Sequence, residues 1–247
     1  MLKMSRNPLS AVPHLKGSMD RKPDYPFKIK SPLLTSMSCL ISGSPASGKT
    51  SLITSFLLSK DPVYYHKFFD AIFIITGSSQ TMSLDDFGLP PSNIYTEYTE
   101  EIMAEILDKL QQEDNGNSLI WLDDVINDLS PADKVLNKAI LNRRHITQNH
   151  NDKTRAELSI WISTQKYNRL ALRYRTNITC FIIFPTSNHA EIRNIKDELL
   201  GDLTKEQQDA VLDICFSEPY SFLFINTLMP KGKRLYCKFD LLKLEEI

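Results

Sequence analysis

Eight consecutive residues carry the clearest chemical signal in the sequence. They match the pattern G-x-x-x-x-G-K-[ST] at every fixed position: Gly43, Ser44, Pro45, Ala46, Ser47, Gly48, Lys49 and Thr50. Such a loop wraps its backbone N–H groups around phosphates, and its glycines let the backbone approach the anion closely. Lys49 would bring a positive charge to the β and γ phosphates, and the Thr50 hydroxyl would ligate Mg²⁺. A helix is expected to begin at the next residue, Ser51. The pattern predicts a site for a nucleoside triphosphate with Mg²⁺.

Two carboxylates follow an apolar run further along the chain. Residues 119–122 read Leu-Ile-Trp-Leu, and Asp123 and Asp124 come directly after them. Ligands of parallel sheets bind at the carboxyl ends of the strands. We therefore expect Asp123 to hold the Mg²⁺ through its water shell and Asp124 to orient or deprotonate an attacking water. Because two aspartates after a strand are also a common start of a loop, this interpretation depends on the phosphate loop.

Polar and basic residues follow the next apolar run. The run at residues 158–162 is followed by Ser163, Thr164 and Gln165. The Gln165 amide is a candidate sensor of the γ-phosphate, and a purely structural role is the alternative. Residues 141–175 hold eight basic side chains against Asp152 and Glu157, namely Arg143, Arg144, Lys153, Arg155, Lys166, Arg169, Arg173 and Arg175. They could form a solvated basic face, contact a nucleic-acid backbone, or supply an arginine finger to a neighbouring subunit. Arg144, its neighbour Arg143, and Arg175 are the finger candidates.

Alternating apolar runs and helical patterns predict the elements that position these residues. We expect strands at 33–41, 68–76, 118–123, 158–163 and 178–184, with helices at 51–58, 100–112, 131–142, 190–199 and 205–216. Two further strand-like runs, 220–228 and 234–240, flank a turn that contains Gly232. The predicted fold class is α/β: a P-loop NTPase with a mostly parallel central sheet flanked by helices and a C-terminal β-hairpin extension.

Composition sets the broad limits on organisation and location. We expect a basic, proline-containing arm over residues 1–30. This arm is either a tail or strap over the domain edge, or a segment that binds DNA or a partner. One ATPase domain is expected over 31–247, with the C-terminal helices and hairpin from about 188. A net charge of -1 excludes a polybasic coat protein. No run reaches the length of a membrane span, no export signal follows Met1, and the four cysteines lie far apart, so we expect no membrane insertion and a reducing compartment.

Several of these segments together resemble a known family. The phosphate loop, the strand that ends in Asp123 and Asp124, the Arg143-Arg144-His145 triplet, the strand followed by Thr164-Gln165-Lys166-Tyr167, and the run from Leu170 to Asn177 are similar to the poxvirus-type virion packaging ATPases. These form the viral arm of the FtsK-HerA superfamily. One departure is that residues 170–172 read Leu-Ala-Leu and lack the proline that the family often has before its arginine segment.

The resemblance implies a motor that uses ATP and Mg²⁺ to pump double-stranded DNA into a preformed viral capsid. It further implies a homo-oligomeric ring of five or six subunits, contact with a capsid or vertex protein, and a location in the virion or the host-cell cytoplasm. Two alternatives remain open. One is a nucleoside or nucleotide kinase, which Asp123 and Asp124 disfavour; the other is a nucleotide-gated DNA-binding or assembly protein with little turnover, which the full set of polar residues disfavours.

Overall fold

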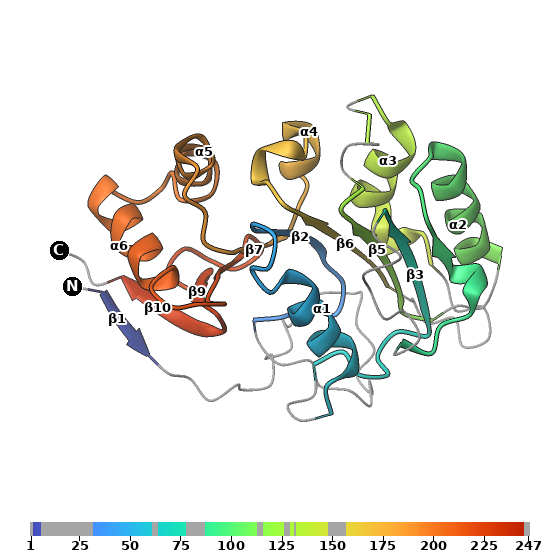
Figure 1. The fold of residues 1–247 in the computed structure, drawn as a ribbon, viewed down its shortest axis with the longest axis horizontal. Helices are drawn as coiled ribbons and strands as arrows, with labels where there is room; N and C mark the ends of the chain where they lie inside the picture. The colour runs from blue at the N-terminus through green and yellow to red at the C-terminus, as the bar shows by residue number, and fades with distance from the viewer. Residues whose placement is uncertain are drawn as a thin grey trace.

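The computed structural model describes residues 2–5, 32–60, 64–77, 87–112, 116–125, 129–130, 132–147 and 157–244. In this part of the chain ten strands form one sheet in the order β1-β10-β9-β8-β7-β2-β6-β5-β3-β4 (Figure 1). The strands are β1 (Leu2–Ser5), β2 (Ser38–Ser42), β3 (Ala71–Thr76), β4 (Ile94–Tyr95), β5 (Ser118–Asp123), β6 (Leu158–Thr164), β7 (Cys180–Ile183), β8 (Leu223–Asn226), β9 (Leu235–Cys237) and β10 (Asp240–Leu244). The six neighbours from β7 to β4 are parallel, and β8, β9, β10 and β1 continue the sheet in antiparallel pairs. This confirms the predicted fold class.

Helices cover both faces of the sheet. One face carries α1 (Lys49–Leu58), and the other carries α2 (Glu100–Gln112), α3 (Lys134–Asn142), α4 (Leu172–Arg175), α5 (His189–Leu199) and α6 (Lys205–Cys215) (Figure 1). Successive residues of a strand therefore enter different cores: Trp121 of β5 packs on the side of α1, whereas Leu122 packs on the side of α2 and α3. Burial on both faces explains why the parallel strands are continuously apolar in sequence.

Capping interactions set where the helices begin. The Asp133 carboxylate accepts a hydrogen bond from the Leu136 backbone N–H at 2.9 Å, so α3 begins at Lys134 and not at 131, the start expected from sequence; Pro131 itself lies outside the described residues. At α6, Thr204 and Gln207 form a reciprocal capping box. Both caps satisfy backbone N–H groups that the first helical turn leaves unpaired.

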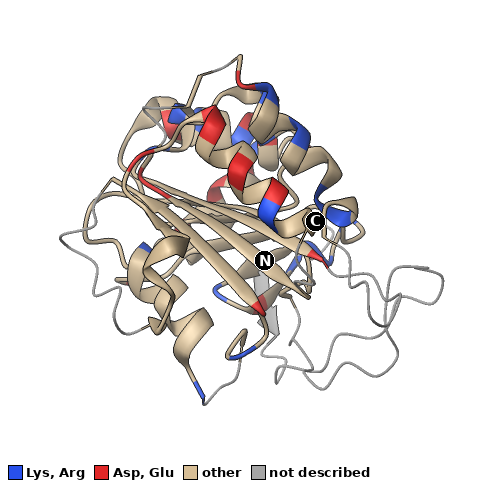
Figure 2. Cartoon of the chain, turned by 90° about the vertical axis from the view of Figure 1, so that its right-hand side faces the viewer, with Lys and Arg blue, Asp and Glu red and all other residues tan. Residues whose placement is uncertain are grey.

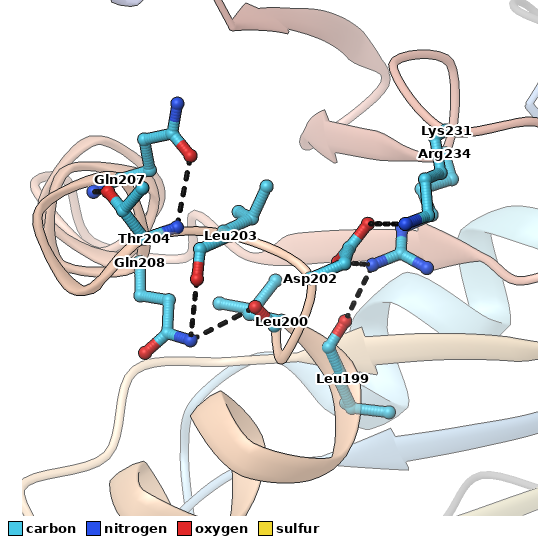
Figure 3. A network of polar contacts seen from close by, with 9 residues as sticks. All are labelled: Leu199, Leu200, Asp202, Leu203, Thr204, Gln207, Gln208, Lys231 and Arg234. Carbon is cyan, nitrogen blue, oxygen red and sulfur yellow. Dashed lines mark hydrogen bonds and ion pairs between the residues drawn. The ribbon is translucent and has the colours of Figure 1, made fainter.

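A polar network fixes the α5–α6 junction to the turn between β8 and β9 (Figure 3). Arg234 forms an ion pair with Asp202 and donates to the Leu199 carbonyl oxygen at 3.3 Å. Gln208 of α6 donates to the carbonyl oxygen of Leu200 at 3.0 Å. The C-terminal helices and the antiparallel strands are thus held together by contacts distant in sequence.

The C-terminal extension differs from the expected hairpin. β8 and β9 pair antiparallel as predicted, but the expected second strand, 234–240, is wrong as a single element. Lys238 has φ 53°, and the chain reverses there, so that β10 begins at Asp240 and pairs with β9. A left-handed residue cannot continue an extended strand, which is why the run divides into two strands.

The N-terminal arm contributes to the same edge. β1 pairs antiparallel with β10 through four residue pairs, Leu2 to Ser5 against Leu244 to Leu241. The remainder of the predicted arm, residues 6–30, lies outside the described residues. Within the described residues, no helix is both long and apolar enough to cross a bilayer.

Candidate nucleotide-binding site

The phosphate loop connects the end of β2 to the start of α1. The Gly43 N–H donates to the Thr164 carbonyl oxygen of β6 at 3.1 Å, which fixes the first residue of the loop to the sheet. A Cβ atom on Gly43 would lie 2.6 Å from both Phe184 Cβ and Ser47 Oγ, closer than atoms can approach. Gly48 has φ 101°, a conformation that side chains disfavour. Both glycines of the motif are therefore required by the local shape of the loop.

The loop presents donors suited to a phosphate chain. The Lys49 ammonium donates to the carbonyl oxygens of Gly43 at 2.6 Å and Ser44 at 3.0 Å, and only 8% of the residue is exposed. Burial lowers the pKa of Lys49, while Asp124 and Asp123 oppose this shift. Ser47 Oγ is buried without a hydrogen-bond partner among the described residues.

The other predicted binding residues form the rim of the loop. Ser44, Pro45, Ala46, Thr50 and Ser51 are exposed, with Thr50 and Ser51 in the first turn of α1. Backbone N–H groups, the buried Lys49 charge and the hydroxyls at a helix N-terminus form a donor set that suits a triphosphate. The Thr50 hydroxyl is at the position where this type of loop supplies a Mg²⁺ ligand.

Asp123 ends β5 within a network that crosses three strands. Its Oδ1 accepts from Ser163 Oγ of β6 at 2.5 Å, and its Oδ2 accepts from Thr76 Oγ1 of β3 at 3.2 Å. Burial raises the pKa of Asp123, the Asp124 charge raises it further, and the two hydroxyls and Lys49 counteract both effects. Sequence analysis did not identify Thr76, although its position as the polar end of an apolar run was a usable signal.

Asp124 and Gln165 lie together beyond the ends of β5 and β6. Gln165 Nε2 donates to Asp124 Oδ2 at 3.2 Å, and the Asp124 N–H donates to the Ser163 carbonyl oxygen at 3.1 Å. Asp124 has φ 53°, so the backbone turns sharply out of the strand at this residue. The structure thus brings the expected water-activating carboxylate and the expected phosphate sensor into contact.

Strand register explains why these groups meet at one edge. Thr76 pairs with Asp123, Asp123 pairs with Ser163, and Thr164 pairs with Ser42, the residue before the phosphate loop. Four parallel strands therefore end level with one another, and their following residues face the same region. Lys49 feels the charges of both aspartates, which agrees with this arrangement.

The two arginine-finger candidates lie in different settings. Arg144 is exposed in a short 3₁₀ helix, Arg143–His145, that follows α3. The neighbouring Arg143 is buried and interacts electrostatically with Glu157, which precedes β6, and with Cys180, which begins β7. Arg144 therefore lies toward the amino-end edge of the sheet, opposite the phosphate loop of its own chain.

Arg175 is bound within its own chain. Its Nε and Nη2 donate to the two Glu198 carboxylate oxygens at 2.8 and 2.6 Å, its Nη1 donates to the Leu170 carbonyl oxygen, and its guanidinium lies 4.8 Å from the centre of the Tyr167 ring. Only 8% of Arg175 is exposed. This geometry disfavours Arg175 as a group offered to a neighbouring subunit.

Two aromatic residues missed by the sequence analysis border the phosphate loop. Phe184 follows β7 and packs against Gly43, and Tyr220 precedes β8 and lies beside Gly48. Phe184 ends an apolar run, and Tyr220 begins the strand-like run 220–228 expected from sequence, although β8 itself begins only at Leu223. The position of Tyr220 at the site depends wholly on the path of the chain after α6.

Comparisons with known proteins show the fold. No protein-family model and no curated protein sequence matches the chain. The genome packaging NTPase B204 from Sulfolobus turreted icosahedral virus 2, in complex with AMP, matches with a TM-score of 0.63 and 16% identity over 83% of this chain and 98% of that chain. Its complex with AMPPCP gives a TM-score of 0.61 and 17% identity over the same shares, 83% and 98%.

A third structure agrees with these two. B204, the DNA-packaging ATPase from Sulfolobus Turreted Icosahedral Virus, matches with a TM-score of 0.58 and 16% identity over 83% of this chain and 98% of that chain. In all three matches the similarity covers 83% of this chain and 98% of the other chain. The chain therefore has the P-loop ATPase fold of the viral genome packaging NTPases.

Proposed function

We propose that this protein is an Mg²⁺-dependent ATPase that translocates double-stranded DNA during the packaging of a viral genome. The main support is the contact between Asp124 and Gln165 at the sheet edge that also carries the Lys49 loop. A similar fold occurs in B204, which is described as a DNA-packaging ATPase and binds AMP and AMPPCP. The proposed setting is a ring of subunits at a viral capsid or vertex protein, in the virion or host cytoplasm.

Each residue has a distinct task in this proposal. The loop from Gly43 to Ser51 binds the phosphates, Lys49 contacts the β and γ phosphates, and Asp124 orients and deprotonates the attacking water. Mg²⁺ bound near Thr50 and Asp123 would neutralise charge that develops on the phosphate oxygens. Gln165 donates to the γ-phosphate and positions the water, and Arg144 of a neighbouring subunit stabilises the transition state.

The surface charge restricts how DNA could be bound. On the side that Figure 2 shows, Lys and Arg of the described residues are interspersed with Asp and Glu over the helical layer. Of the basic segment, Arg144, Lys166 and Arg169 are exposed, whereas Lys153 and Arg155 lie outside the described residues. Lys166 directly follows Gln165, so a cation at this position could link DNA contact to the γ-phosphate sensor.

The first test is steady-state ATP hydrolysis with and without long double-stranded DNA, at low and moderate salt. We expect DNA to stimulate hydrolysis by wild-type protein, less so as salt rises, because contacts to the phosphate backbone release counterions. Lys49→Ala should abolish hydrolysis. Lys166→Ala should reduce the DNA stimulation, and Lys205→Ala, at the exposed first residue of α6, serves as the matched control.

The other outcomes separate the alternatives. Consumption of ATP only when a nucleoside is supplied would indicate a kinase. ATP binding with negligible turnover, with or without DNA, would indicate a nucleotide-gated switch. Either result would overturn the proposed motor.

A second prediction concerns Asp124. We expect Asp124→Asn to retain ATP binding and to slow hydrolysis by about two orders of magnitude or more, because the amide cannot accept the proton of the water. Asparagine tolerates the left-handed backbone at this position, so the variant should fold. Binding is measured by calorimetry and turnover by phosphate release. Turnover at the wild-type rate would exclude the assigned role.

A further inference from the structure

Tyr220 has an unusual conformation for an aromatic residue. It lies between α6 and β8, has φ 59°, and is 69% exposed. A bulky side chain rarely adopts a left-handed backbone, and an exposed ring gains little from burial in the core. The conformation therefore places the ring on the surface at a backbone geometry that the residue itself disfavours.

Neighbouring contacts hold the ring beside the phosphate loop. A Cβ atom on Gly48 would lie 3.1 Å from Tyr220 Cδ1, so the ring edge lies against the residue that directly precedes α1. The segment is stabilised by a Ser221 N–H hydrogen bond to the Glu218 carbonyl oxygen at 3.2 Å and by a Lys238–Glu218 ion pair at 3.1 Å. The buried Phe222 packs on Phe184, with ring centroids 5.4 Å apart, beneath the loop.

Strand order places Tyr220 on the side of the loop opposite the acids. Starting from β2, Asp123 and Asp124 lie beyond β6, whereas Tyr220 leads into β8, beyond β7. The γ-phosphate of a bound nucleotide must lie near Asp124 and Gln165 for hydrolysis. The nucleoside must then extend from the other end of the phosphate chain, past Gly48 and toward Tyr220.

We propose that Tyr220 stacks on the base of the bound purine nucleotide. The assignment rests on the nucleotide site of the proposed function and adds the group that recognises the nucleoside. A tyrosine ring offers a large flat surface with few rotatable bonds, and its stacking on a base tolerates different bases because each has a π-face. Tyr220 thus contributes affinity for the nucleoside and has no role in the chemistry of the phosphates.

The test compares ATP with inorganic tripolyphosphate, which keeps the phosphates and lacks the nucleoside. Both are titrated calorimetrically, with Mg²⁺, into wild-type protein, Tyr220→Ala, Tyr220→Gly and Tyr220→Phe. We expect Tyr220→Ala and Tyr220→Gly to bind ATP roughly 5- to 150-fold more weakly and to bind tripolyphosphate as wild type does. Tyr220→Phe should retain wild-type affinity for both ligands because it keeps the ring.

Two controls address folding. Glycine accepts a positive φ, so agreement between Tyr220→Gly and Tyr220→Ala excludes backbone strain in the variant as the cause. Leu228→Ala removes another exposed apolar side chain, from the turn after β8, and should bind both ligands as wild type does.

Two results would overturn the stacking role. One is unchanged ATP affinity in Tyr220→Ala and Tyr220→Gly, as expected if the ring contacts a partner protein. The other is an equal loss of ATP and tripolyphosphate, as expected if the ring only shapes the loop. Wild-type protein that binds neither ligand would overturn the nucleotide site itself. Normal ATP binding without stimulation by DNA would overturn the motor, and the Tyr220 variants would still decide the stacking role.

Discussion

Asp123 illustrates how an ionisable residue is held at the end of an apolar strand. Two hydroxyl groups from the neighbouring strands each donate to one of its oxygens. Burial and the adjacent Asp124 nonetheless raise the pKa of Asp123 above its ordinary value. The ionised form is therefore less favourable in the folded protein than in the unfolded chain, which is typical of residues kept for function.

Asp123→Asn should stabilise the protein near neutral pH. Because the pKa of Asp123 is raised on folding, the folded state keeps its proton at a pH where the unfolded chain has released it. Stability therefore falls as pH rises from about 3.9, the unfolded value, through the raised folded pKa, and the penalty is complete above it. The amide removes this penalty and can still pair with the Ser163 and Thr76 hydroxyls.

Urea unfolding at pH 7 and at roughly pH 4 measures the effect. The variant should have the higher midpoint at pH 7, and the difference should shrink at the lower pH. Asp108→Asn, at an exposed position of α2, provides the control. A midpoint at pH 7 equal to or below that of wild type would contradict the prediction. The same variant should lose Mg²⁺-dependent hydrolysis.

Two residues in the connection from β6 to β7 hold this segment against α5. Tyr167 donates to Glu198 Oε2 at 2.8 Å, and the same carboxylate accepts two hydrogen bonds from Arg175. Glu198 belongs to α5, so the cluster fastens α4 and the segment after Gln165 to a helix that comes later in the chain. Motif residues near the site therefore act in part as structural anchors.

Arg175 and Arg144 should separate in their effects on stability and turnover. Arg175→Met removes the donor to the Leu170 carbonyl and leaves Glu198 with Tyr167 as its remaining partner in this cluster, and we expect a loss of about 2–3 kcal/mol in the free energy of unfolding. Arg144→Ala removes an exposed side chain and should change stability by less than about 0.5 kcal/mol. Denaturant unfolding of both variants measures this difference.

Hydrolysis assays then test the finger role of Arg144. Arg144→Ala alone should be inactive, and mixtures with Lys49→Ala subunits should regain turnover, since each variant supplies what the other lacks. Turnover that is lost and not restored by mixing would indicate action within one chain. Normal turnover by Arg144→Ala would remove the assignment.

At the scale of the whole molecule, β1 closes one edge of the sheet. Without it, β10 would present unpaired backbone N–H and C=O groups, which readily pair with another chain. Residues 2–5 thereby pair with an antiparallel group of strands, β8 to β10, that lies more than 200 residues later in the sequence.

Deletion of residues 1–5 should expose β10. We expect faster hydrogen exchange at those amides among residues 241–244 that point toward β1, because their partners are lost. The amides of β2, β5 and β6, in the middle of the sheet, should keep their protection and act as the internal control. Unchanged exchange across β10 would contradict a stable β1–β10 pair.

The sequence by itself determined the features that depend on neighbouring residues. The phosphate loop needs glycine at both ends, and the φ of Gly48 and the crowding at Gly43 show the physical reason. The apolar run before Asp123 predicted a strand buried on both faces with its acids at the carboxyl end, because burial on both sides removes the polar alternation. The fold class followed from the same local patterns.

Only the tertiary structure decided the contacts between distant segments. The placement of β6 between β2 and β5 brings Gln165 to Asp124, and the fold pairs Arg175, one of the finger candidates, with Glu198 of its own chain. Tyr220 reaches Gly48 because the chain after α6 enters the sheet at β8, on the side of β2 opposite to β6 and β5. Periodicity reports which face of an element is buried, whereas strand order and these side-chain partners arise from packing the whole sheet between its helices.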